Sequence, residues 1–98
     1  MRVDWTRTAL SDLDAIHAFI AAGSPHYATA VVDRVTARCT QISAFPYSGE
    51  MVPEYRREDI REVIEYSYRI IYLIHDPVTW VLTIVHGAKP LPDSPPTP

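Results

Sequence analysis

A chain of 98 residues forms one domain with one modest core, and 47% hydrophobic with 21% charged residues is ordinary for a globular protein. Its formal net charge of −3, from 9 Lys and Arg against 12 Asp and Glu, argues against general RNA or DNA binding and favours a protein partner. The single cysteine, Cys39, excludes an intramolecular disulfide. Because no signal peptide opens the chain and no apolar run approaches a membrane span, we expect a cytoplasmic protein.

The N-terminal residues predict a strand followed by a helix. Residues 2–5 alternate in polarity, which is typical of a short strand at or near a sheet edge. An amphipathic helix follows, with Thr6 or Thr8 as its cap and Gly23 near its end. Its apolar side chains recur at helical spacing. They are Ala9, Leu13, Ile16 and Ile20.

A second helix begins at Ser24-Pro25, because serine is a favoured N-cap and proline fits the first helical position. It stops before Pro46. Its apolar stripe has the same spacing, with Val32 beside it. The stripe consists of Ala28, Val31, Val35, Cys39 and Ile42. The short link makes the two helices an antiparallel hairpin, which needs a flat surface to pack on.

The C-terminal half predicts a sheet. Residues 46–49 form a turn, and residues 50–59 form a polar connector with a short strand near Met51-Val52. Three strands with short, antiparallel connections follow. They cover residues 60–65, 68–75 and 78–86. The predicted fold is therefore α+β, in the order β-α-α-β-β-β, with the helical hairpin on one face of a mainly antiparallel sheet.

The last two strands are apolar on both faces, although the helices can cover only one. On the strand at 78–86, simple alternation puts Trp80, Leu82 and Ile84 on one face and Val81 and Val85 on the other. The second face should therefore stay open unless a partner, the connector or the tail covers it.

We expect the domain to span residues 1–89 and residues 90–98 to form a flexible tail. Five of the nine prolines lie in these last residues. Such a segment cannot form a helix or a central strand, so a mobile or extended conformation is predicted.

The turn at Tyr66-Ser67 leaves the register of the central hairpin open. A two-residue loop puts Arg61 on the face of Tyr72 and Arg69 on the other face, whereas a three-residue loop brings the arginines together. Only the second register allows a joint anion site. We expect Arg61 to form a structural ion pair with a nearby carboxylate such as Glu54 or Asp59, and Arg69 to contact a partner.

The remaining polar residues predict no metal or cofactor site. Cys39 lies in a helical pattern and is expected to be a small buried residue. The four histidines have no ligand-pair spacing with cysteine or carboxylates that would indicate a metal site. They are His17, His26, His75 and His86.

Several ordered segments together resemble the RelE/ParE superfamily of type II toxins. Residues 5–16 are similar to the family's first helix, and Phe45-Pro46 followed by Gly49 resembles its turn. The family's central motif is similar to residues 61–63 and 68–72. The end of its last strand is similar to the Val-His-Gly-Ala-Lys run at 85–89. The resemblance covers residues 1 to about 91 and implies an antitoxin partner.

The resemblance implies two alternative activities. RelE-like members cleave mRNA on the ribosome, whereas ParE-like members act on DNA gyrase. RNA cleavage needs a base, an acid and several cations around the phosphate. The residues that match such a site are Arg61, Arg69, His86 and Lys89. The strand before Arg69 has no lysine, Glu62 and Glu65 accompany Arg61, and the tail has no cation.

We therefore predict a ParE-like toxin that has no catalytic residues and acts by binding. Its expected partners are a ParD-like antitoxin, in a hetero-oligomer, and DNA gyrase; neither a membrane nor sequence-specific nucleic acid binding is expected. The candidate contact residues combine the helix flanks with the sheet. They are Leu13, Ile20, Val32, Arg69, Ile71, Leu73, His86 and Lys89. The alternatives are a ribosome-dependent nuclease and a non-toxic binding module, and the chain departs from the family at Lys89, where arginine is usual.

Overall fold

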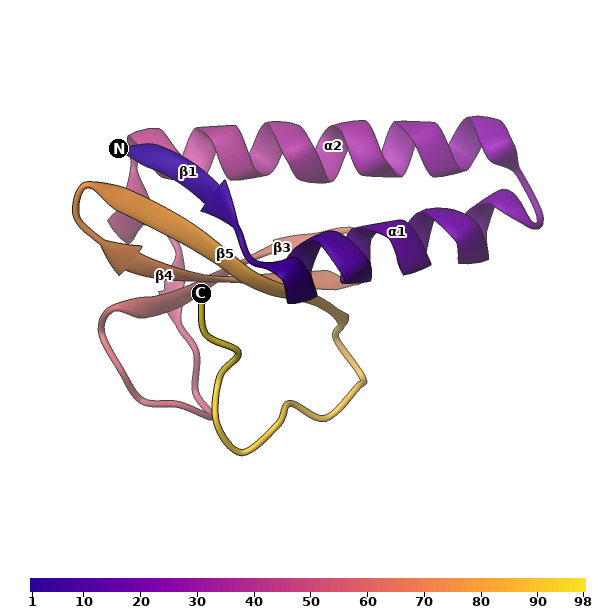
Figure 1. Cartoon of the computed structure of the whole chain (residues 1–98). Helices are drawn as coiled ribbons and strands as arrows, with labels where there is room; N and C mark the ends of the chain where they lie inside the picture. Colours follow the sequence, from indigo (N-terminus) through magenta and orange to yellow (C-terminus); the bar gives the residue numbers. More distant parts are fainter.

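The computed structural model describes residues 1–98 and has the predicted α+β architecture (Figure 1). Two helices lie antiparallel over one face of a five-stranded sheet, whose strand order is β1-β5-β4-β3-β2. The edge strand β1 runs parallel to β5, and all the other pairs are antiparallel. The elements are β1 (Arg2–Trp5), α1 (Arg7–Ala21), α2 (Pro25–Ala44), a 3-10 turn (Pro46–Ser48), β2 (Glu50–Met51), β3 (Ile60–Glu65), β4 (Tyr68–His75) and β5 (Val78–His86).

Side-chain caps fix the beginning of each helix. The Thr6 hydroxyl accepts a hydrogen bond from the backbone N–H of Ala9 at 3.0 Å, so Thr6 and not Thr8 is the cap of α1. The same hydroxyl donates to the carbonyl of Leu82 at 2.7 Å, which ties the beginning of α1 to β5. The Ser24 hydroxyl caps α2 as predicted, accepting from the N–H of Tyr27 at 3.2 Å.

The larger core fills the space between the helices and the sheet. Fully buried positions of α2 face the inward side chains of β3, β4 and β5, while Leu13, Ile16 and Ile20 of α1 pack against them half-buried. The buried members are Ala9, Val31, Val35, Cys39, Ile42, Val63, Ile70, Tyr72, Ile74, Val81 and Ile84. Every predicted stripe position on α2 is buried, which confirms the helical spacing.

The second face of the sheet carries its own smaller core, which the connector and the tail cover. Buried Val52 and half-buried Tyr55 reach it from the connector, and Leu91 reaches it from the tail. The buried members are Val52, Ile60, Ile71, Leu82 and Val85. Of the three possible covers named for this face, a partner, the connector and the tail, the last two are therefore part of the chain itself. Residues 90–98 form neither helix nor strand, bend at Asp93 and Ser94, and lie against the domain.

A β-bulge corrects the predicted faces of β5. Tyr72 of β4 pairs with Val81, but the preceding Ile71 pairs with Thr83, so Leu82 is an extra residue on β5. Simple alternation is therefore wrong here. Ile84 lies with Val81 in the larger core, and Leu82 lies with Val85 in the smaller one.

The central hairpin has a two-residue loop. Glu65 pairs with Tyr68, and Tyr66 takes the left-handed conformation that such a turn needs, with φ of 53°. Arg61 consequently lies opposite Tyr72, while Arg69 lies opposite Ile64 on the other face. The register that would have brought the two arginines together is excluded.

No helix in the structure combines the length and the apolar character of a membrane span.

Candidate functional site

Arg69 forms a clasp between two glutamates, which we call the Arg69 clasp (Glu54, Glu62 and Arg69). Its guanidinium donates to both carboxylate oxygens of Glu62, at 2.7 and 2.9 Å, and to both of Glu54, at 2.7 and 2.8 Å. Glu62 is two residues from Arg69's cross-strand partner on β3, whereas Glu54 comes from the connector. The side chain of Arg69 is 12% exposed. Four of its five N–H donors bind carboxylate oxygens, and the clasp holds the connector on the sheet.

The clasp shifts the protonation of its members. Hydrogen bonds from Arg69 lower the pKa of Glu54 to about 2. Hydrogen bonds to Glu54 and Glu62 raise the pKa of Arg69, so the guanidinium stays charged at any physiological pH. Two carboxylates on one guanidinium leave the clasp with a net negative charge, which is unfavourable for a phosphate ligand.

The depressed pKa of Glu54 predicts a contribution to stability that acid removes. Because the folded-state pKa lies below the ordinary value of 4.5, the contribution is fully present above pH 4.5 and is lost as the pH falls through about 2. We expect Glu54→Gln to be less stable than the parent at pH 6 by less than about 1 kcal/mol, since solvent screens a carboxylate this exposed. The difference should shrink between pH 4.5 and 2.

Urea unfolding of both proteins across this pH range measures that difference directly. Glu58→Gln is the matched control, because Glu58 is an exposed connector glutamate without an ion pair, and its difference from the parent should stay flat. A Glu54→Gln difference that does not change between pH 4.5 and 2 would contradict the role assigned to this carboxylate.

Arg61 is fixed by backbone carbonyls and not by a carboxylate. Its Nε donates to the carbonyl of Glu58, its Nη1 donates to the carbonyl of Gly49, both at 3.0 Å, and its guanidinium stacks on the Tyr47 ring at 5.1 Å. The predicted ion pair of Arg61 with Glu54 or Asp59 is therefore wrong. Glu54 binds Arg69, and Asp59 binds Arg57 at 2.7 Å. The connector folds so that Glu54 and Asp59 meet different arginines.

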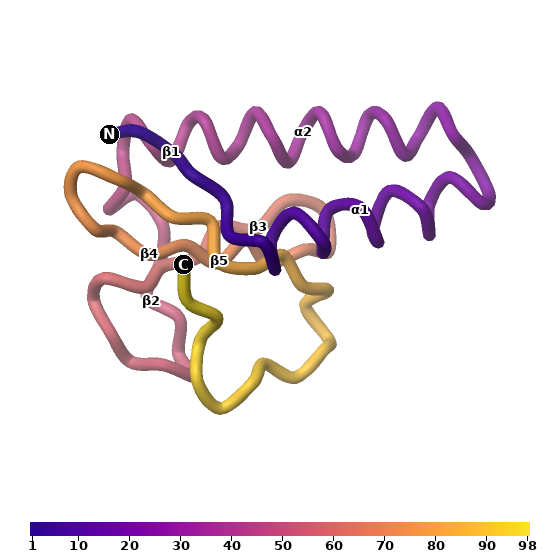
Figure 2. Tube along the Cα trace, in the orientation of Figure 1, coloured from indigo at the N-terminus to yellow at the C-terminus, as the bar shows by residue number.

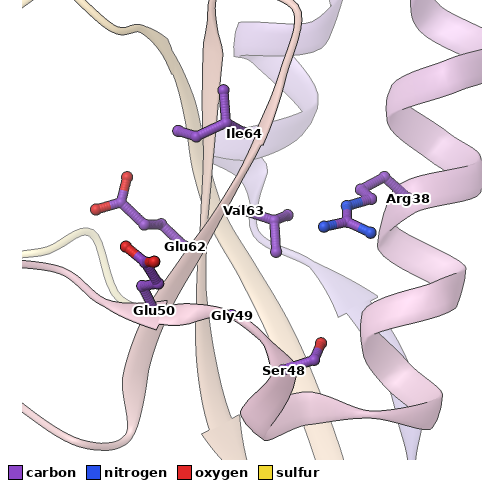
Figure 3. Close-up of a pocket in the computed structure, with 7 residues that line it drawn as sticks. All are labelled: Arg38, Ser48, Gly49, Glu50, Glu62, Val63 and Ile64. Carbon is purple, nitrogen blue, oxygen red and sulfur yellow. The ribbon is translucent and has the colours of Figure 1, made fainter.

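A polar hollow of about 430 Å³ lies beside the short pairing of β2 with β3 (Figure 3). Glu50 and Glu62 are cross-strand neighbours, and their carboxylates lie together on one side of the sheet. On the other side, Arg38 reaches from α2 toward Val63. The adjacent like charges make this hollow, too, a poor phosphate site.

Another hollow, which we call the α1 groove, is mainly apolar. It has a volume of about 350 Å³ and lies between α1 and the neighbouring ends of β4 and β5. The ring of Phe19 is 81% exposed at its wall, and Tyr68 meets the ring of His86 edge to face, with centroids 5.9 Å apart. The lining residues are Asp12, Ala15, Ile16, Phe19, Tyr68, Ile84, Val85, His86 and Lys89. An apolar floor with charged ends suits a helical or extended peptide segment.

The structure separates the predicted site residues. The four residues that matched a nuclease are not brought into one site, because Arg61 and Arg69 lie on opposite faces and Arg69 is saturated by carboxylates. His86 and Lys89 do meet, in the α1 groove.

The predicted contact residues divide by exposure. Leu13, Ile20 and Val32 are half-buried on the helices, and Leu73 is half-buried against the smaller core. Ile71 is completely buried beneath the connector and the tail, so its prediction as a contact is wrong for this conformation. Sequence reasoning did not single out Phe19, whose exposed ring lines the α1 groove, although its place at the flank of an apolar stripe was the available signal.

The chain groups no three histidine, cysteine or carboxylate side chains in a metal-binding arrangement. Burial raises the pKa of the Cys39 thiol to about 12, so this cysteine is a core residue and not a nucleophile. What the fold and its hollows define is a small α+β protein with an apolar docking groove and two immobilised arginines.

Comparison with known proteins agrees with this class. The family model for the ParE toxin of the type II toxin-antitoxin system parDE matches residues 3–91, and the chain belongs to this family. No curated protein sequence matches. The fold is similar to a chain of the chromosomal ParDE toxin-antitoxin system from P. aeruginosa, with a TM-score of 0.72 and 20% identity, over 88% of this chain and 95% of that one.

A second structural relative comes from the other branch of the superfamily. It is a chain of the toxin-antitoxin complex RelBE2 from Mycobacterium tuberculosis, with a TM-score of 0.56 and 24% identity, over 87% of this chain and 95% of that one. At these identities the two structures establish the fold, and the family match establishes a ParE-type toxin.

Proposed function

We propose that this ParE-family chain acts by binding DNA gyrase, and that a ParD-like antitoxin neutralises it. The observation that carries the choice of binding over RNA cleavage is the Arg69 clasp. A cation that stabilises a phosphorane must offer free donors. Here each guanidinium nitrogen of Arg69 donates to a carboxylate at 2.7 to 2.9 Å.

The other cations do not supply a substitute. Arg61 lies on the opposite face and is bound to two backbone carbonyls. Lys89 and the imidazole of His86 stand at an apolar groove, and the carboxylate of Asp12 lines the same groove. The surfaces beside the clasp carry Glu50 and Glu62 together. A polyanion would meet unfavourable charge at each approach to the clasp.

Induction of the chain alone in bacteria tests this proposal. We expect growth arrest, cleaved chromosomal DNA and an SOS response, and linear DNA should accumulate when the purified protein is added to gyrase and plasmid. Cleaved mRNA with intact DNA would instead establish a ribosome-dependent nuclease and overturn the proposal. Normal growth would favour a non-toxic binding module.

For the antitoxin we propose docking in the α1 groove, with contacts that extend to Leu13, Ile20 and Val32 on the helices. The groove offers an exposed aromatic ring over an apolar floor, and binding energy concentrates in such anchors. Asp12 and Lys89 add opposite charges to the lining, which can complement charges on the bound segment. Leu73 and Arg69 can join the contacts only if the connector moves, because they are packed beneath it or clasped to it.

Phe19→Ala is expected to weaken antitoxin binding about tenfold to thirtyfold, because it removes an exposed aromatic anchor. Leu10→Ala is the matched control: Leu10 is 52% exposed on the same helix, and its position nine residues earlier points it to the opposite flank. Titration of the purified toxin variants with the antitoxin encoded beside this chain measures both affinities. Equal affinities for the two variants would place the antitoxin elsewhere.

A further inference from the structure

The C-terminal tail is shaped in advance for an extended conformation. Proline fixes its own φ near −65° and pushes the preceding residue out of the helical region. Between residues 89 and 98 nearly every residue is either a proline or precedes one. The residues that precede prolines are Lys89, Leu91, Ser94, Pro95 and Thr97. The tail therefore favours a polyproline II conformation and loses little entropy when it is held in place.

The tail occupies the second face of the sheet, on the side opposite the helices (Figures 1 and 2). Leu91 packs against the smaller core, together with Tyr55, Leu73 and Trp80. The Tyr55 hydroxyl donates to the carbonyl of Pro92 at 2.9 Å. Beyond this bond, Pro95 and Pro96 are also half-buried.

The residues that hold the tail are positioned independently of it. Tyr55 lies in a tight turn of the connector, where the N–H groups of Tyr55 and Arg56 donate to the carbonyl of Val52 at 3.1 and 3.0 Å. Val52 is buried, and the neighbouring Glu54 is tied to the sheet by the Arg69 clasp. Trp80 is part of β5. The backbone that carries the two aromatic residues is thus held by contacts other than those with the tail.

An apolar surface that carries aromatic side chains, Tyr55 and Trp80, with a hydroxyl donor bound to a carbonyl of the tail, matches the chemistry by which proteins recognise polyproline II segments. We propose that the second face of this toxin carries a binding site for extended, proline-rich segments, and that residues 90–96 occupy it as an internal ligand. Leu91 is the anchor of this ligand and the Pro92 carbonyl fixes its position. The site is separate from the α1 groove and does not depend on the proposed gyrase target.

A spin label on the tail tests whether the site is occupied. Ser94→Cys in the full-length chain provides one reactive thiol, because Cys39 is buried and its pKa is about 12. We expect a nitroxide at this position to be largely immobilised. Adding Leu91→Asp should release the tail and shorten the label's correlation time roughly tenfold, toward that of a free terminus. Tyr55→Phe, which removes only the hydroxyl, should release part of it.

The released site should then accept the same sequence from outside. A fluorescent peptide of residues 88–98 is expected to bind the Leu91→Asp protein at least tenfold more tightly than the parent, whose site is filled by its own tail. Leu10→Asp, at an exposed leucine on α1, is the matched control and should leave both the label and the peptide affinity at parental values.

Two results would overturn the proposal. A label that is as mobile in the parent as in Leu91→Asp would mean that the tail does not occupy the face, and a peptide that binds neither protein would mean that the face is not a site. Immobilisation that disappears on dilution would show that the tail of a second copy is the occupant, and would overturn the internal ligand.

Discussion

Replacing Arg69 with alanine is expected to lower the free energy of unfolding by about 3 kcal/mol, because it strands carboxylates that the guanidinium now neutralises. The largest part of this cost arises at Glu62, since its side chain is only 12% exposed and it loses both charged hydrogen bonds. Arg69→Lys should recover only part of the loss, because an ammonium cannot bind two carboxylates in the bidentate geometry of the clasp. Urea unfolding at neutral pH measures all three proteins.

The cause of the loss is tested by a double variant. Adding Glu62→Gln to Arg69→Ala removes the stranded charge and should restore roughly 1 kcal/mol or more. Arg34→Ala is the matched control, because Arg34 also pairs with a glutamate but is 65% exposed, and its loss should stay below about 1 kcal/mol. A stable Arg69→Ala protein that has lost toxicity would show instead that Arg69 acts on the target.

Gly49→Ala is expected to cost about 3 kcal/mol, because an added methyl group has no room there. A Cβ at Gly49 would overlap the Tyr72 hydroxyl and would lie 2.7 Å from the Glu62 carbonyl oxygen. The backbone φ of Gly49 is −77°, so close packing and not torsional freedom requires glycine. The Tyr72 hydroxyl donates to the carbonyl of Pro46 at 2.5 Å and accepts from the N–H of Gly49 at 3.2 Å, which leaves it little freedom to move.

Tyr72→Phe in the Gly49→Ala background should relieve the clash with the hydroxyl. In a double-mutant cycle, the double variant should therefore lose less unfolding free energy than the two single variants lose together. Gly23→Ala serves as the control, since the nearest atom to its Cβ is 3.8 Å away and its φ is not positive. Its stability should stay within about 1 kcal/mol of the parent. Thermal or urea unfolding separates these outcomes, and additive losses would assign the clash to the Glu62 carbonyl.

Local chemistry made the helices and strands predictable. Ser24-Pro25 marks the start of α2, and the spacing of apolar residues from Ala28 to Ile42 places its buried face. The three strands of the second half have the predicted bounds because short turns separate runs of β-branched and aromatic residues. The match to the ParE family model confirms the predicted family, and the sheet topology confirms the fold class and the edge position of β1.

Features that depend on distant contacts were not predictable. The loop at Tyr66 has no Asn-Gly signal, since a tyrosine takes the left-handed conformation there. The bulge at Leu82 leaves no mark in the alternation of β5. The partners of Arg69 lie 7 and 15 residues away, and the sequence did not show whether a partner, the connector or the tail covers the smaller core, nor that Val52 and Tyr55 do so. The α1 groove depends on the bulge, because Ile84, Val85 and His86 of its lining follow Leu82 on β5.

The position of β5 has a consequence for synthesis of the protein. This strand lies between β1 and β4 and contributes to both cores, yet it ends at His86 of 98 residues. The N-terminal strand must therefore wait for a partner about 76 residues later, while translation adds roughly 5–20 residues per second. Until β5 emerges, β1 has no neighbour in the sheet, and the α1 groove lacks Ile84, Val85 and His86. The two cores are therefore completed late in synthesis, by one and the same strand.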